Sequence, residues 1–214
     1  MTKPVVFGAN YSVYTRIVRL VLEEKNVPYR IEEIDIFEKD GPPDGYADRH
    51  PFLRIPAFEH DGFRLYETAA IAGYIDNTFP EPPLMPESAE KRARADQIIG
   101  ILDNYAYRTW VWDIFVERIR VPERGENSDE AKITEALLRA ETCLSSIENL
   151  MGGEKYFLGS EATLADFHAA PMIALFRLAP EGDRLLSDHM PWTSWWETMS
   201  ERPSIAATRF AAEG

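Results

Sequence analysis

The sequence predicts a mixed α/β part followed by an all-helical part, and three observations lead to this fold class. Strand-like and helix-like runs alternate over the first third of the chain. Four prolines then fall within the nine positions from Thr78 to Pro86, which neither a helix interior nor a central strand accommodates. Beyond them, nearly every periodic stretch is helical. We therefore predict domains at residues 1–78 and 88–214, joined by a proline-rich linker at 79–87.

The first part is predicted to follow the order βαβ, a loop, then ββα. Val5–Phe7 has the pattern of a buried strand, and a second strand covers Tyr29–Ile36 with a break in its alternation that suggests a bulge. The pair Asp61-Gly62 offers the positive-φ positions of a tight hairpin between two short strands. The helical faces are Val13, Ile17, Leu20 and Val21 in the first helix and Ile71, Tyr74 and Ile75 in the last.

The second part carries apolar stripes at helical spacing. Ser128 is expected to open a helix, and Thr163 with Asp166 has the spacing of a capping box. Trp192, Trp195 and Trp196 are interpreted as packing residues of a late helix. The longest stripe consists of Ile98, Ile101, Leu102, Tyr105, Trp112, Phe115 and Ile119.

Charge and cysteine content exclude several classes of function. The formal net charge of the 214 residues is -13, so the chain repels nucleic acid and anionic membrane surfaces. Cys143 is the single cysteine, which excludes a disulfide framework and suits a cytoplasmic protein. Neither a targeting segment nor a membrane-spanning run is expected. The four histidines lack the spacing of metal ligands, so no metal is predicted.

The first strand-to-helix turn, Gly8-Ala9-Asn10-Tyr11-Ser12, is where a ligand of an open α/β sheet is expected. Gly8, Ser12 and the following Thr15-Arg16 resemble the first motif of serine-type cytosolic glutathione S-transferases, in particular a phi-like bacterial member. The segments His50-Pro51-Phe52-Leu53-Arg54-Ile55-Pro56-Ala57-Phe58 and Leu65-Tyr66-Glu67-Thr68-Ala69-Ala70-Ile71 are similar to the glutathione site of that family. The linker and the helical second part extend the resemblance over nearly the whole chain.

This resemblance implies a thioredoxin-like first domain that binds glutathione as co-substrate. Pro56 would be cis, which turns the amide and carbonyl of Ile55 toward the cysteinyl backbone of glutathione; the alternative is a trans proline at the start of a strand. Thr68 at a helix start would receive the γ-glutamyl carboxylate, and Glu67 the ammonium group. An ordinary N-cap at Thr68 is compatible with that role.

Ser12 is the candidate for activating the thiol of glutathione. A free thiol with a pKa of ~8.5 is only ~3% ionised at pH 7, and lowering that pKa by ~2 makes most of it thiolate. A hydrogen bond from the Ser12 hydroxyl, together with a helix N-terminus, supplies an effect of that size. Tyr11 is the rival donor, and a simple N-cap is the alternative role of Ser12. With no cysteine in this turn, thiol transfer through a mixed disulfide lacks its nucleophile.

The glycine end of glutathione has the weakest provision in the sequence. The histidine-lysine pair that holds the glycine carboxylate in phi-like relatives is absent, and the loop from Phe37 to Arg49 is acidic. Lys39 and Arg54 are the remaining candidates, with a solvated surface charge as the alternative for both.

An apolar electrophile is the expected second substrate. Tyr11, Tyr14, Tyr105 and Trp112 would form an aromatic wall for it, although such residues also form interdomain core or dimer interface. We expect a homodimeric glutathione transferase (EC 2.5.1.18-like) that conjugates hydrophobic electrophiles, a detoxification activity. The enzymatic alternatives are a glutathione-dependent isomerase or peroxidase. The alternative of another class is a non-catalytic binding or interaction module.

Overall fold

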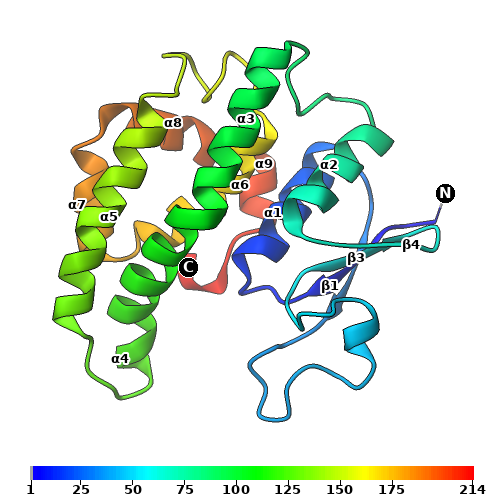
Figure 1. Cartoon of the computed structure of the whole chain (residues 1–214), viewed down its shortest axis with the longest axis horizontal. Coiled ribbons are helices and arrows are strands. Elements are labelled where there is room, and N and C mark those ends of the chain that lie inside the picture. Colours follow the sequence, from blue (N-terminus) through cyan, green and yellow to red (C-terminus); the bar gives the residue numbers. More distant parts are fainter. Residues whose placement is uncertain (1) are drawn as a thin grey trace. The chain divides into compact units, whose positions relative to one another are not determined.

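The computed structural model describes residues 2–214 and divides into two compact units (Figure 1). The first unit contains the chain up to Leu84 together with Pro203–Ala211, and the second contains Met85–Arg202 with 212–214. The first unit therefore includes a segment from near the C-terminus that the sequence analysis assigned to the helical domain. Within residues 2–214, none of the helices is long and apolar enough to cross a membrane.

The first unit has the predicted order of elements around a mixed sheet. The strands lie in the order β2-β1-β3-β4, with β1 parallel to β2 and antiparallel to β3. This confirms the predicted fold class and its βαβ-ββα order. The elements are β1 (Val5–Gly8), α1 (Val13–Glu24), β2 (Arg30–Glu33), η1 (Tyr46–Asp48), β3 (Ala57–His60), β4 (Phe63–Tyr66), α2 (Thr68–Thr78) and α9 (Pro203–Ala207).

The two faces of this sheet are covered differently. Helices α1 and α2 pack against each other and against strands β1 and β4, and the predicted face of α1 is buried. On the other face, Phe7 and Ala57, which pair across β1 and β3, share a small core with Tyr46 and Ile55 from the segment that leads into β3. The sheet therefore holds the end of β1 and the start of β3 side by side. The turn that carries Ser12 follows the end of β1, and Ile55-Pro56 directly precedes β3, so these two candidate segments lie at the same edge of the sheet.

The hairpin is confirmed, whereas the second strand is shorter than predicted. Asp61 and Gly62 have φ of 49° and 81°, as a two-residue hairpin with two positive-φ positions requires. The predicted strand over Tyr29–Ile36 is wrong in length, because β2 ends at Glu33. Ile34 still bonds to the Gly8 carbonyl at 3.2 Å and is buried, after which the chain leaves the sheet. The irregular alternation therefore marked the end of pairing at an edge strand and not a bulge.

The second unit consists of helices, as predicted. Trp110, Trp192 and Trp195 lie in one aromatic core with Phe157 and Phe176, which confirms Trp192 and Trp195 of α8 as packing residues. Trp196 is only half-buried. The helices are α3 (Ala89–Ile101), η2 (Leu102–Arg120), α4 (Val121–Glu123), α5 (Glu130–Glu148), α6 (Leu164–Phe176), α7 (Pro180–Ser187) and α8 (Met190–Ser200), and η3 (Ala211–Glu213) ends the chain.

Two local predictions for this unit hold in detail, and one needs a small correction. The Thr163–Asp166 capping box is present at the start of α6, where the buried Asp166 carboxylate also accepts from the indole N–H of Trp195. Cys143, the single cysteine, was interpreted from its helical segment as a small core residue, and it is buried in α5. The N-cap of α5 is Asp129 and not Ser128, whose hydroxyl donates instead to the Glu117 carbonyl.

The predicted stripe along the long central helix is only partly correct. Tyr105 is 65% exposed, whereas Phe115 is buried as predicted. From Ile98 to the end of η2, the residues that are 0% exposed are spaced four apart, at Ile98, Leu102, Ala106, Trp110 and Ile114. Hydrogen bonding in η2 reaches five residues back, as from the Val121 amide to the Val116 carbonyl. This winding holds more residues per turn than an α-helix, so positions four apart stay on one face. The prediction assumed a period of 3.6 and therefore missed Trp110 and Ile114.

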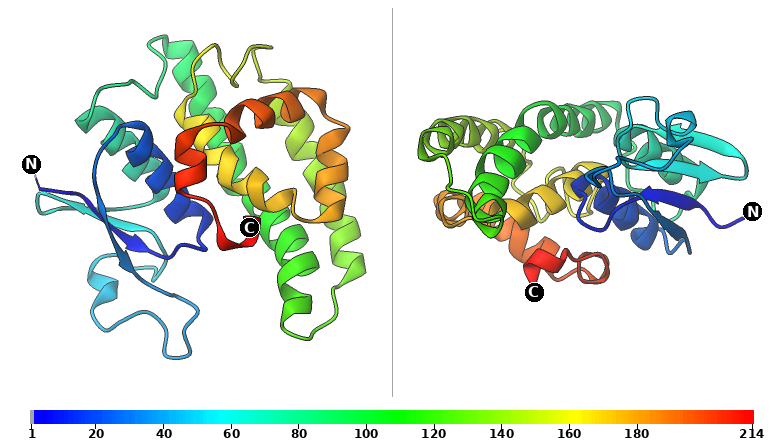
Figure 2. Two further views of the ribbon diagram at one scale, coloured as in Figure 1. Left: turned by 180° about the vertical axis from the view of Figure 1, so that it is seen from behind. Right: turned by 90° about the horizontal axis from the view of Figure 1, so that it is seen from below.

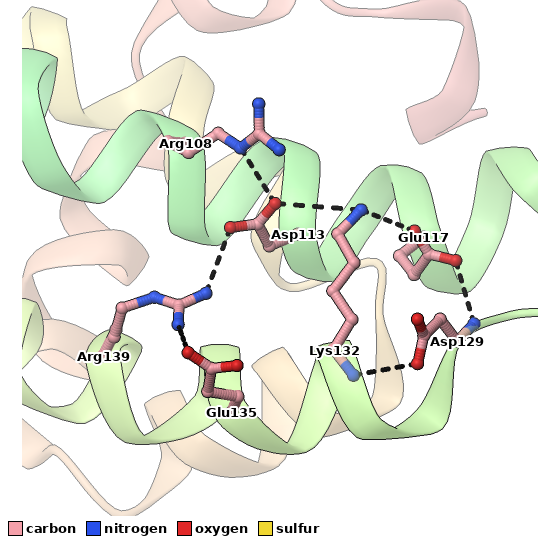
Figure 3. A network of polar contacts seen from close by, with 7 residues as sticks. All are labelled: Arg108, Asp113, Glu117, Asp129, Lys132, Glu135 and Arg139. Atoms are coloured by element: carbon pink, nitrogen blue, oxygen red, sulfur yellow. Dashed lines mark hydrogen bonds and ion pairs between the residues drawn. The ribbon is translucent and has the colours of Figure 1, made fainter.

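A network of charged side chains joins η2 to α5 (Figure 3). Asp113 is 5% exposed, and its carboxylate oxygens lie 2.9 Å from Arg108 Nε, 3.2 Å from Arg139 Nη2 and 3.8 Å from Lys132 Nζ. One turn further on, Glu117 accepts from the same lysine at 2.7 Å and from the Asp129 amide at 2.9 Å. Because Asp113 is surrounded by three cations, its negative charge is compensated where it is buried.

Candidate functional site

Ser12 lies at the point where β1 gives way to α1. Its amide donates to the Ala9 carbonyl at 3.1 Å and closes a tight turn. Gly8 is required before this turn, because a Cβ there would overlap the buried Thr15 hydroxyl. Ser12 is the N-cap of α1, and its Oγ accepts from the Thr15 amide at 3.2 Å. Capping uses a lone pair of the oxygen, so the hydroxyl hydrogen remains available to a ligand.

The surroundings of Ser12 favour an anion. The first turn of α1 contains no acidic residue, so the positive end of the helix dipole is uncompensated there. The N-cap role and the role of hydrogen-bond donor to sulfur are therefore compatible at one residue.

Tyr11, the rival donor, is already engaged. Its hydroxyl donates to Asp35 Oδ1 at 2.6 Å, and its ring lies 5.6 Å from that of Phe37. Burial and the Asp35 carboxylate raise the pKa of the Tyr11 phenol well above its usual value. A phenol whose hydrogen is held by a carboxylate is a poor donor to a thiolate. The sequence analysis did not find Asp35, because 24 residues separate it from Tyr11 and no local pattern links them.

The Ile55-Pro56 segment presents free backbone groups. The Ile55–Pro56 peptide bond is cis, as the resemblance implied, and a second cis bond joins Glu81 to Pro82. Within residues 2–214, Ile55 makes no backbone–backbone hydrogen bond, although its side chain is buried. The Tyr46 hydroxyl donates to the Arg54 carbonyl at 2.8 Å and holds the segment in place. An extended peptide ligand can therefore pair with the amide and carbonyl of Ile55.

Glu67 and Thr68 form the start of α2. Glu67 is its N-cap with φ of 69°, a conformation that is rare for a side chain other than glycine and often found at ligand sites. Its side chain makes no capping bond, so the first amides of α2 are open to an anion. Thr68 is thus the first helical residue and not the N-cap that the sequence analysis allowed for. The Glu67 carboxylate is exposed.

His50 is a residue of this region to which the sequence analysis assigned no role, naming it only as the first residue of the segment similar to the family's glutathione site. It is 3% exposed, its ring lies 5.0 Å from that of Tyr66, and no partner for its Nδ1 is present among residues 2–214. Burial lowers the pKa of His50, while the charge of Glu67 raises it and that of Arg54 lowers it further. His50 thus lies close to both charged groups and is kept neutral by burial.

The candidates for the glycine carboxylate are exposed cations. Arg54 and Lys39 make no ion pair within the described part of the chain. Arg49, the other cation of the acidic loop, pairs with Glu59 and lies 4.0 Å over the Phe7 ring, so it is occupied. Only Arg54 directly adjoins the Ile55-Pro56 segment in the sequence.

The predicted aromatic wall is divided between the two units. Tyr11 and Tyr14 belong to the first unit, where Tyr11 is exposed and Tyr14 is half-buried. Tyr105 and Trp112 belong to the second, where Tyr105 is exposed and Trp112 is half-buried. Their grouping into one pocket stays a prediction.

Comparison with known proteins decides the family. A model of the glutathione S-transferase N-terminal domain matches residues 6–83, and one of the C-terminal domain matches residues 101–203. The chain belongs to the glutathione S-transferase family. The matches confirm the family and the enzyme class that the sequence analysis expected.

Individual relatives of this glutathione S-transferase agree along most of its length. It is 27% identical over 203 residues to glutathione S-transferase F12 of Arabidopsis thaliana, covering 93% of this chain and 94% of the relative. It is also 26% identical to probable maleylacetoacetate isomerase 2 of Drosophila melanogaster, over 80% of this chain and 73% of the relative. Among solved structures, glutathione S-transferase-I bound with lactoylglutathione is 25% identical with a TM-score of 0.83, covering 97% and 98% of the two chains.

Proposed function

We propose that this protein is a glutathione transferase that stabilises the glutathione thiolate through Ser12 and adds it to a hydrophobic electrophile. The observation that carries the proposal is the difference between two neighbouring hydroxyl groups. Ser12 accepts the Thr15 amide and keeps its hydrogen available, whereas the Tyr11 hydrogen is committed to Asp35. Of the two candidate donors, Ser12 alone combines a free hydroxyl hydrogen with a position at the N-terminus of α1.

Glutathione is held at three points in this proposal. The amide and carbonyl of Ile55, next to Pro56, pair with the cysteinyl backbone, because neither has a backbone partner in the described part of the chain. The exposed Glu67 carboxylate binds the γ-glutamyl ammonium, and Thr68 with the open amides of α2 binds the γ-glutamyl carboxylate. Arg54 and Lys39 supply positive charge for the glycine carboxylate.

Steady-state kinetics with an activated aryl chloride tests this function. Ser12→Ala is expected to lower kcat roughly tenfold to thirtyfold at pH 7, because most of the bound thiol then stays protonated. Tyr11→Phe is the matched control, since it also removes one hydroxyl, and it is expected to retain most of the wild-type rate. A wild-type enzyme that binds glutathione but gives no conjugate would favour the non-catalytic binding module.

A glutathione-dependent isomerase is the second candidate, and the Drosophila relative named a probable maleylacetoacetate isomerase favours it. The same Ser12-stabilised thiolate would add to a cis double bond and then leave after rotation, so glutathione is regenerated. Conjugation, in contrast, consumes one glutathione per turnover. Following both the absorbance of a cis-dienoate and the free thiol concentration separates the two reactions. Peroxidase activity and a cytoplasmic location stay predictions from the sequence.

We also propose a homodimer. Phe52 and Tyr66 are 67% and 38% exposed and lie in contact at a ring distance of 6.3 Å, with the exposed Leu53 next to them in the chain. An apolar surface of this kind suits an interface with a second copy of the chain. Light scattering coupled to gel filtration is expected to give twice the chain mass for the wild type and a lower mass for Phe52→Ser. A monomeric wild type at micromolar concentration would contradict the proposal.

A further inference from the structure

Arg19 connects the turn that carries Ser12 to the C-terminal segment of the first unit. It lies on α1, and its Nη1 donates to Asn10 Oδ1 at 3.0 Å. Its Nη2 donates to the Ala207 carbonyl at 3.3 Å, and its Nε donates to the Tyr29 hydroxyl at 3.3 Å. One guanidinium group therefore bonds three segments that are distant in the sequence, and its planar fork fixes their relative directions.

The C-terminal segment, residues 203–211, is itself firmly placed on α1 (Figure 2). Arg16 is 1% exposed and donates to the Ile205 carbonyl at 3.3 Å and to the Thr208 hydroxyl at 3.4 Å. Its guanidinium carbon lies 4.3 Å from the centre of the Phe210 ring. Ser204 also hydrogen-bonds Glu24 at the other end of α1. The Ala207 carbonyl is thus a fixed anchor for Arg19.

The turn from Ala9 to Ser12 is stabilised by few backbone contacts. One backbone hydrogen bond closes it, from the Ser12 amide to the Ala9 carbonyl, and the two corner residues, Asn10 and Tyr11, are exposed. Each corner is tied by its side chain, Asn10 to Arg19 and Tyr11 to Asp35. The Asp35 carboxylate oxygen also accepts from the Phe37 amide at 2.8 Å, so the residue that binds Tyr11 is itself fixed to the backbone. Arg19, which binds Asn10, is fixed by its bond to the Ala207 carbonyl.

We propose that Arg19 is a positioning residue that fixes the Ser12 hydroxyl by tying Asn10 to the C-terminal segment. The proposal rests on the proposed function, because it takes Ser12 as the donor to the thiolate. A hydrogen bond weakens steeply as its length and angle depart from the optimum. A turn that is free to shift therefore loses part of the stabilisation of the thiolate, while the groups that bind the rest of glutathione, at Ile55 and Glu67, are unaffected.

The test is the pKa of the glutathione thiol bound to the enzyme, followed by the ultraviolet absorbance of the thiolate. Arg19→Met keeps the apolar stem and removes all three bonds, and Asn10→Ala removes only the bond at the turn. Arg19→Lys keeps the charge but reaches only one partner at a time. Arg30→Met is the matched control, because Arg30 is exposed on β2 and, among the described residues, its side chain pairs only with the nearby Glu32.

Arg19→Met and Asn10→Ala are each expected to raise the bound thiol pKa by about 0.5 to 1, which is roughly threefold to tenfold less thiolate below that pKa. Arg19→Lys is expected to fall between them and the wild type, the double variant to equal the single ones, and KM for glutathione to stay within about twofold. Asn10→Ala keeps the test decisive if Arg19→Met does not fold. An unchanged thiol pKa in Asn10→Ala overturns the proposal, whereas an unshifted pKa in the wild type overturns the proposed function instead.

Discussion

Replacement of Glu67 by Gln tests the capture of the γ-glutamyl end. The change removes the negative charge and keeps the shape of the side chain at its unusual backbone angle of 69°. In the proposed function, the Glu67 carboxylate receives the ammonium group of glutathione. A hydrogen bond to a charged group contributes about 1.5 to 3 kcal/mol, and the exposure of Glu67 places it at the lower end of this range.

A loss of about 1.5 kcal/mol corresponds to roughly tenfold weaker binding. We would measure it by isothermal titration calorimetry with S-methylglutathione, which has no thiol to ionise and so reports binding alone. Glu38→Gln is the matched control, because Glu38 is an exposed carboxylate in the acidic loop and its loss should leave binding unchanged or slightly tighter. Equal affinity of Glu67→Gln and the wild type would refute the assignment of the ammonium group to Glu67.

Three further predictions concern stability. Burial alone would lower the pKa of His189, but hydrogen bonds to Glu148 at 2.6 Å and Glu141 at 3.2 Å raise it overall. The stabilisation from this histidine is complete below the unfolded pKa of ~6.5 and is lost as pH rises through the higher folded value. In urea unfolding, the difference in free energy of unfolding between the wild type and His189→Gln should therefore shrink with rising pH, and a difference that grows would contradict this. Asp113→Asn should lower the free energy of unfolding by about 1 to 3 kcal/mol, because it leaves three cations without their shared carboxylate (Figure 3). Glu135→Gln, which removes one exposed partner of Arg139, should lower it by less than about 0.5 kcal/mol. Similar losses for both variants would show that burial of Asp113 is unimportant. Gly8→Ala should destabilise the protein by about 1 to 3 kcal/mol, because the added Cβ overlaps Thr15. Gly73→Ala in α2, where the added Cβ has no neighbour, should stabilise it by about 0.5 to 1 kcal/mol. A Gly8→Ala variant as stable as the wild type would refute the close approach at this turn.

Local patterns in the sequence were sufficient for most of the fold. The hairpin at Asp61-Gly62, the capping box of α6 and the apolar face of α1 each depend on residues a few positions apart, and all three are present. The stripe along η2 was predicted with the wrong period, because the prediction assumed α-helical spacing and the hydrogen bonds of η2 reach five residues back.

The parts of the site that the sequence analysis missed depend on distant contacts. The tie from Tyr11 to Asp35 spans 24 residues, and that from Arg19 to Ala207 spans 188. In the sequence, Asp35 and Arg19 cannot be distinguished from ordinary solvated surface charges. The placement of the C-terminal segment on α1 was likewise not predicted, because its anchors are a buried Arg16 and backbone carbonyls, which leave no pattern in the sequence.

The pKa of glutathione bound to the wild type and to Ser12→Ala, read from the ultraviolet absorbance of the thiolate, tests the central claim most directly. The wild type should ionise bound glutathione near pH 6.5, about 2 units below the free thiol at ~8.5. Ser12→Ala should raise this pKa by at least about 1.6, the rise that a tenfold loss of thiolate at pH 7 requires, with Tyr11→Phe close to the wild type. A bound thiol near 8.5 in the wild type, or an equal shift in the wild type and Ser12→Ala, would contradict the role of Ser12.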